Sequence, residues 1–341
     1  MKGADLKEYR FDPVVPYLEQ LRKEEIRAEQ KSRTLKELRR QGNRAGLAVL
    51  AFIGLQFFLM FPISFLNGLG SAASDPLFQS AFGAVFSFVC LFLPFLYVYK
   101  KMSPAEKQKV EDAFEKPKTN FLMLVAIPAG FMFCMAGNYI VGYLVSLMDS
   151  VGVELSSPEP AVPSGFLGAL VYVLQIAFLP ALIEEFALRG VVMQPLRRYG
   201  DGFAIFVTAL VFALMHGNMV QAPFALIAGL AIGYFSVATG SVWTGVLIHF
   251  ANNLFSALLS LINGSSSFVS DNIYAAFMSL SFVAGLACCV LFFLSPKRIR
   301  LEKSKYKIGL ALRGFKYFSG LPMLIALAAI AYITSDYIRL K

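Results

Sequence analysis

The sequence has little charge for its length. Asp, Glu, Lys and Arg make up 16% of the 341 residues, whereas hydrophobic residues make up 57%. A soluble domain averages about 25% charged residues. The apolar runs approach ~20 residues, the length that crosses ~30 Å of hydrocarbon. The composition therefore excludes an ordinary soluble domain and indicates a protein that spans a membrane.

Cysteine is also scarce. The four cysteines all lie in apolar segments, and none belongs to a CxxC motif: Cys90, Cys134, Cys288 and Cys289. Adjacent cysteines cannot pair in ordinary helix geometry, and the others resemble small apolar helix residues. The sequence therefore predicts neither a disulfide framework nor a thiolate metal site.

Two further features are missing. Residues 1–44 are charged and contain no apolar stretch typical of a signal peptide, so we expect no cleavable leader. The net charge of +9 comes from separated clusters of Lys and Arg and not from a basic face with stacking aromatics. We therefore expect no nucleic-acid partner.

The apolar segments predict an all-α fold, a polytopic transmembrane helix bundle of eight or nine spans. We expect the spans near Ala45–Leu66, Leu77–Tyr99, Phe121–Met148, Phe166–Leu188, Phe203–His216, Pro223–Ala238, Val242–Ile262, Ile273–Leu294 and Gly320–Ile333.

The distribution of Lys and Arg predicts the orientation. These residues cluster before the first span, in Lys100–Lys118, at Arg197-Arg198 and in Lys297–Lys316, whereas the alternate loops contain none. By the positive-inside rule, we expect a cytoplasmic N-terminus. The chain carries no ER-retention tail, so we expect a multi-pass protein of a bacterial plasma membrane, with membrane lipid as a partner.

We divide the chain into four regions. They are a charged cytoplasmic helical segment (1–44), N-terminal transmembrane helices (45–165), a core that carries the chemistry (166–262) and C-terminal transmembrane helices (263–341). We expect the charged helix to cover Tyr17–Gln41 and to end at Gly42-Asn43. We leave open whether it is only solvated or docks a partner.

The core contains an acidic pair and an arginine. Glu185 and Arg189 are four residues apart with the acid first, the favourable order for a helical ion pair. This pairing would leave Glu184 free to face the interior, where a carboxylate could accept a proton from water. Pro180, one turn earlier, should kink the helix beside a cavity. The competing interpretation is an ion pair at a helix end, with Glu184 only solvated.

The two histidines of the chain follow on later helices. Phe212 lies one turn before His216 and can stack on its ring. His249 and Asn253 are four residues apart and share a helix face, so both could donate to an oxyanion. Either pair could instead form interhelical hydrogen bonds. Two histidines and a glutamate could also bind zinc, the candidate metal if one is present, but no HExxH motif occurs.

These residues form three motifs, EExxxR at Glu184–Arg189, FxxxH at Phe212–His216 and HxxxN at His249–Asn253. Their order and spacing resemble the CPBP family of intramembrane proteases. That family includes the type II CAAX prenyl endopeptidases (the Rce1-like group) and the bacteriocin-processing and self-immunity proteins.

The resemblance covers roughly Phe166–Leu261. It implies an intramembrane endopeptidase with a peptide or protein substrate. Glu184 and His216 would activate water, His249 and Asn253 would stabilise the oxyanion, and Glu185 and Arg189 would support the site.

Two alternatives stay open at this point. They are a catalytically silent immunity or scaffold protein of the same fold and a proton-coupled transporter. One spatial conflict also arises. Alternating topology places Glu184 near the cytoplasmic side but His216 ~20 Å along the fifth helix. We expect that helix to start outside the interface, to tilt, or to lie in a water-filled cavity.

Overall fold

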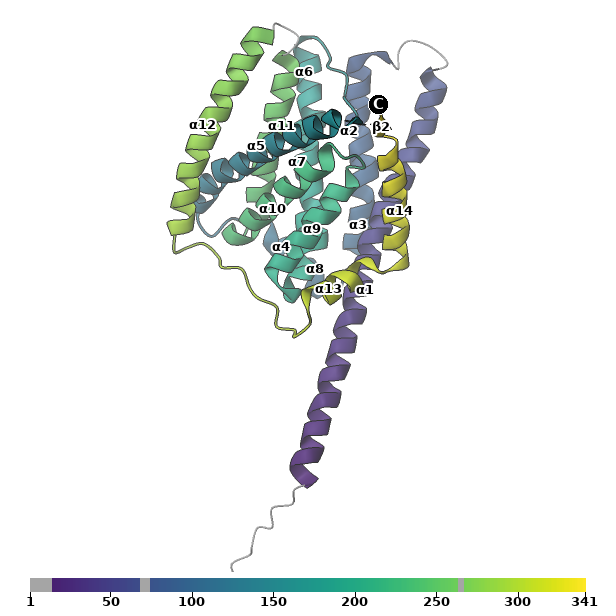
Figure 1. Cartoon of the computed structure of the whole chain (residues 1–341), viewed down its shortest axis with the longest axis vertical. Helices are drawn as coiled ribbons and strands as arrows, with labels where there is room; N and C mark the ends of the chain where they lie inside the picture. Colours follow the sequence, from purple (N-terminus) through teal and green to yellow (C-terminus); the bar gives the residue numbers. More distant parts are fainter. Residues whose placement is uncertain (1–13, 68–73, 263–266) are drawn as a thin grey trace, which may run out of the picture.

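The computed structural model describes residues 14–67, 74–262 and 267–341. Residues 1–13 of the N-terminal segment and residues 68–73 and 263–266 of two predicted loops lie outside the described residues. The structure is 82% helical, which confirms the predicted all-α bundle (Figure 1).

The helical elements follow one another along the chain. They are α1 (Val14–Asn67), α2 (Pro76–Ser87), η2 (Phe88–Phe92), α3 (Leu93–Lys100), α4 (Pro104–Ala113), α5 (Asn120–Ser150), α6 (Gly165–Val173), η3 (Leu174–Phe178), α7 (Leu179–Glu185), η4 (Phe186–Val192), α8 (Met193–Leu196), η5 (Arg197–Tyr199), α9 (Asp201–Met215), α10 (Gln221–Thr239), α11 (Val242–Ile262), α12 (Ser267–Leu294), α13 (Leu310–Phe318) and α14 (Leu321–Ser335).

Every predicted apolar segment lies largely within these helices. Among the described residues, seven helices are long and apolar enough to cross a membrane, and α13 with α14, bent by 81°, forms an eighth candidate. The remaining segment is α9, an apolar helix of 15 residues. The chain is therefore a multi-pass helix bundle, as the composition predicted.

The predicted end of the N-terminal helix at Gly42-Asn43 is wrong. α1 runs without a break through both residues into the first span. A side chain at Gly42 would collide with the backbone of Tyr317 in α13. This glycine therefore permits close helix packing and does not end the helix.

The predicted end of the fourth span at Leu188 is also wrong. Helical turns continue from Gly165 to Tyr199, a run of 35 residues. The prediction stopped at Arg189 because a charge is costly in hydrocarbon. In the structure, partners inside the bundle pair this charge, so the helix can continue.

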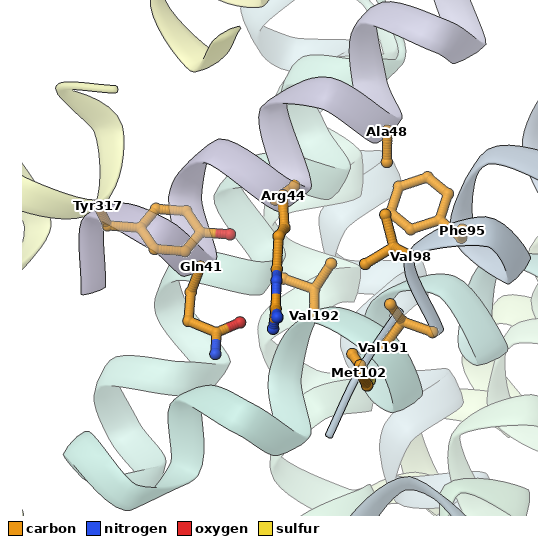
Figure 2. Close-up of a pocket in the computed structure, with 10 residues that line it drawn as sticks. Gln41, Arg44, Ala48, Phe95, Val98, Met102, Val191, Val192 and Tyr317 are labelled. Atoms are coloured by element: carbon orange, nitrogen blue, oxygen red, sulfur yellow. The ribbon is translucent and has the colours of Figure 1, made fainter. Parts of the chain in front are cut away.

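The basic segments gather at one end of the bundle, called here the basic end. There Gln41 and Arg44 of α1 reach Glu106 of α4, at 2.7 Å and 3.3 Å. Arg198 pairs with Glu37 at 3.2 Å. Figure 2 shows Gln41 and Arg44 pointing from α1 into the space beside η4 and α3. The last turns of the charged part of α1 are thus fastened to the bundle, whereas the exposed turns before them project away from it (Figure 1).

The opposite end carries the two short strands. β1 (Val153–Leu155) and β2 (Ile338–Leu340) pair antiparallel, with Val153 opposite Leu340. The backbone N–H of Ser156 also donates to the carbonyl of Tyr337 at 3.0 Å. The loop that follows α5 and contains β1 is therefore tied to the C-terminal residues (Figure 1). It is called here the outer loop because it lies at the end away from the basic segments.

Candidate active site

Glu185, and not Glu184, pairs with Arg189, as the spacing of four residues predicted. The Arg189 guanidinium donates to Oε1 of Glu185 at 2.8 Å, and both side chains are fully buried. A second Arg189 nitrogen donates to the carbonyl of Gly229 at 3.2 Å. The guanidinium also lies over the ring of Phe212, 5.1 Å from its centre. Arg189 is therefore held by three neighbours inside the bundle.

His249 connects the two glutamates. Its Nδ1 lies 2.9 Å from Oε1 of Glu185, and its Nε2 lies 3.6 Å from Oε2 of Glu184. Because a carboxylate that already receives the Arg189 hydrogen is an acceptor, Nδ1 carries the hydrogen in this bond. The Glu185 carboxylate thus fixes the imidazole and turns Nε2 toward Glu184.

Glu184 faces a cavity of about 160 Å³ that His216 also lines. The other lining residues are Phe52, Leu91, Leu188, Phe212 and Met215. Nδ1 of His216 lies 2.8 Å from the carbonyl oxygen of Phe212. A carbonyl only accepts, so Nδ1 donates and Nε2 is the ring nitrogen left for other partners. The cavity is large enough for several waters, since one needs only roughly 10–15 Å³.

Phe212 contacts both histidines. Its ring centre lies 4.8 Å from that of His216 and 5.8 Å from that of His249, both edge to face. The predicted contact between Phe212 and His216 is therefore present, although the two rings meet edge to face and are not stacked.

Asn253 lies one turn beyond His249 on α11, but its side chain has other contacts. Its amide nitrogen donates to the carbonyl of Ile176 at 3.2 Å, and its oxygen accepts from Asn252 at 3.1 Å. Pro180 has no N–H to offer the Ile176 carbonyl four residues earlier. The Asn253 amide thus donates to the Ile176 carbonyl, which lacks its usual helical partner because of Pro180. One amide hydrogen is left for another acceptor.

Chain connectivity explains how Glu184 and His216 reach the same depth. The turn between the two helices is at Gly200, which has φ of 105°. Glu184 lies 16 residues before Gly200 and His216 lies 16 residues after it. In two antiparallel helices both positions are ~24 Å from the turn. The expected conflict in depth arose because we placed Glu184 at a helix end, which the long Gly165–Tyr199 run corrects.

Two glycines permit close helix packing beside the charged side chains of the site. A side chain at Gly229 would lie 3.1 Å from Ala209 of α9. At Gly245, four residues before His249, a Cβ would collide with the Ser236 hydroxyl and would lie 2.9 Å from Oε2 of Glu185. That oxygen has no hydrogen-bond partner among the described residues. We did not single out Gly245 from the sequence, although its spacing from His249 placed it on the same face.

The donor set does not form a three-ligand zinc site. Nδ1 of His249 is already hydrogen-bonded to Glu185, so it is not free to bind a metal. The Arg189 cation contacts the same carboxylate. Among the described residues, no three His, Cys, Asp or Glu side chains are arranged to hold a metal ion.

The family comparison matches the same part of the chain. Residues 166–255 match the family model described as type II CAAX prenyl endopeptidase Rce1-like. This confirms the resemblance predicted from the three motifs, all of which lie inside the matched segment. Neither the curated proteins nor the solved structures contain a match to this chain.

Proposed function

We propose that this chain is an intramembrane endopeptidase in which Glu184 activates water for attack on a peptide bond. The observation that carries the proposal is the position of Glu184. Its carboxylate lines a cavity with His216 and lies 3.6 Å from Nε2 of His249 inside a helix bundle. The match of this segment to a family of proteases supports it.

The proposed step conserves every proton. Glu184 takes a proton from water while the water oxygen bonds to the carbonyl carbon, and the carbonyl electrons move onto oxygen. The C–N bond then breaks, and Glu184 returns its proton to the leaving nitrogen. His216, on the wall of the same cavity, would orient the water through Nε2.

The oxyanion needs donors that are fixed before the reaction. We assign this role to Nε2–H of a doubly protonated His249 and to the free amide hydrogen of Asn253. Glu185 and Arg189 act through His249 by fixing its ring, as the acid of a catalytic triad does. They are therefore positioning residues.

For the substrate, we propose a peptide presented from the membrane, and the matched family makes a prenylated C-terminus the first class to test. The experiment compares the purified wild type with Glu184→Gln on three labelled peptides in liposomes. These are a prenylated C-terminal peptide, the same peptide without the prenyl group, and a transmembrane helix.

We expect the wild type to cleave at least one peptide and Glu184→Gln to lose roughly 10²-fold or more in rate. Unchanged thermal unfolding would show that the variant is folded. Equal turnover by the variant would remove Glu184 from the chemistry. No turnover by either protein on any peptide would favour a silent immunity or scaffold role.

A further inference from the structure

A second cavity lies against the first. It has a volume of about 180 Å³ and is lined by residues of α1, α14, the outer loop and the turn after α9. Phe52, Met215 and His216 line both cavities. These three residues thus form the partition between the cavity that contains Glu184 and the second one, called here the outer chamber.

The outer chamber is polar enough to hold water. Gln56, His216 and Tyr337 line it together with apolar residues such as Ile330 and Ile333. A water needs two to four polar partners and roughly 10–15 Å³ of space to stay in a cavity. A channel lined only by apolar groups would not offer those partners.

Gln56 is the polar exception in its helix segment. From Ala45 to Met60, every other side chain of α1 is apolar or absent. A polar group in such a run is costly and usually lies against a cavity or the bundle interior. α1 also lies outside the segment matched by the family model, so Gln56 belongs to none of the three motifs.

The outer chamber reaches the end of the bundle opposite the basic end. Pro158 follows β1, and Tyr337 precedes β2, the two strands that pair at that end (Figure 1). The contact between Ser156 and the Tyr337 carbonyl holds the loop beside α14. Among the described residues, the chamber therefore extends from this end to His216.

We propose that water reaches Glu184 from the end opposite the basic end, through the outer chamber. In this route Gln56 and Tyr337 position the entering water, Phe52 and Met215 form the gate, and Nε2 of His216 contacts the water that has passed the gate. The inference rests on the proposed function for its purpose, because hydrolysis in hydrocarbon needs a supply of water. The route itself can be tested without any substrate.

The test uses single cysteines in a chain whose four native cysteines are replaced by Ala. A membrane-impermeant, charged methanethiosulfonate is added to one face of sealed vesicles of either orientation. Lys303→Cys reports the basic end and Val162→Cys, in the outer loop, reports the opposite end. Phe58→Cys is the matched control, since Phe58 is two residues from Gln56 but 71% exposed on the outside of the bundle.

We expect Gln56→Cys to react from the same face as Val162→Cys, at least tenfold faster than Phe58→Cys. Reaction only from the Lys303 face, or at the rate of the Phe58 variant, would overturn the route. In the active protein, Phe52→Trp should slow turnover by about tenfold or more by narrowing the gate, whereas Phe58→Trp should not. If the wild type cleaves nothing, the proposed function fails, and the labelling still decides the route.

Discussion

Replacing Glu185 by Gln should destabilise the protein far more than the same change at Glu184. Glu185 is the anion that pairs with Arg189, and both side chains are at most 1% exposed. Breaking a buried ion pair by removing one partner costs about 3–5 kcal/mol, because the other charge is left buried. The Gly229 carbonyl and the Phe212 ring still face the Arg189 guanidinium, so we expect the lower end, about 3 kcal/mol.

The neighbouring carboxylate provides the matched control. Glu184 is 21% exposed and lies 3.6 Å from His249 without a direct hydrogen bond to it. We expect Glu184→Gln to cost less than about 1 kcal/mol, in the range of a weakly coupled ion pair. Comparing the two variants thus separates a loss of catalytic activity from a loss of folding stability.

A double variant tests the cause. Glu185→Gln combined with Arg189→Met removes both charges, and an apolar replacement of a buried pair is often neutral or stabilising. We expect it to recover at least half of the loss. The assay is equilibrium unfolding in a mild detergent. A cost below about 1 kcal/mol for Glu185→Gln, or a double variant no better than the single one, would refute the assigned electrostatics.

Four further outcomes are expected. Gly245→Ala should lower stability by about 1–3 kcal/mol, because its methyl group would press on the Ser236 hydroxyl and the Glu185 carboxylate; unchanged unfolding would contradict this packing. Asn253→Ala should lower the turnover rate roughly 10²–10³-fold, the usual effect of losing one oxyanion donor, and a rate near wild type would remove Asn253 from that role. Burial raises the pKa of Glu106, but hydrogen bonds from Ser103 and Gln41 and the Arg44 charge outweigh it and lower the pKa from 4.5 to about 2. Since the folded-state pKa is depressed, the stability contributed by the ionised Glu106 carboxylate is present above pH 4.5 and is lost as pH falls toward 2. The thermal unfolding temperatures of the wild type and of Glu106→Gln, measured across that range, should therefore converge at the acid end. Finally, a chelator should leave turnover unchanged because no three His, Cys, Asp or Glu side chains among the described residues are arranged to hold a metal ion, and a loss reversed by zinc would contradict this.

The sequence by itself determined the class of fold and the segment that matches the protease family model. Long apolar runs admit few structures other than helices in a membrane, so the bundle followed from composition. The pairing of Glu185 with Arg189 followed from a spacing of four residues, a local property of any helix. The motifs then located the matched segment.

The tertiary structure decided what depends on partners far away in the chain. No local pattern shows that Arg189 pairs with Glu185 inside the bundle and also meets the Gly229 carbonyl and the Phe212 ring there, and so the helix end was misplaced. The same holds for Asn253, whose amide meets a carbonyl 77 residues earlier. The outer chamber also depends on α1 and α14, which are distant from the motifs in sequence. A helix specifies its own turns, but only packing decides which side chain faces a charge, a carbonyl or a cavity.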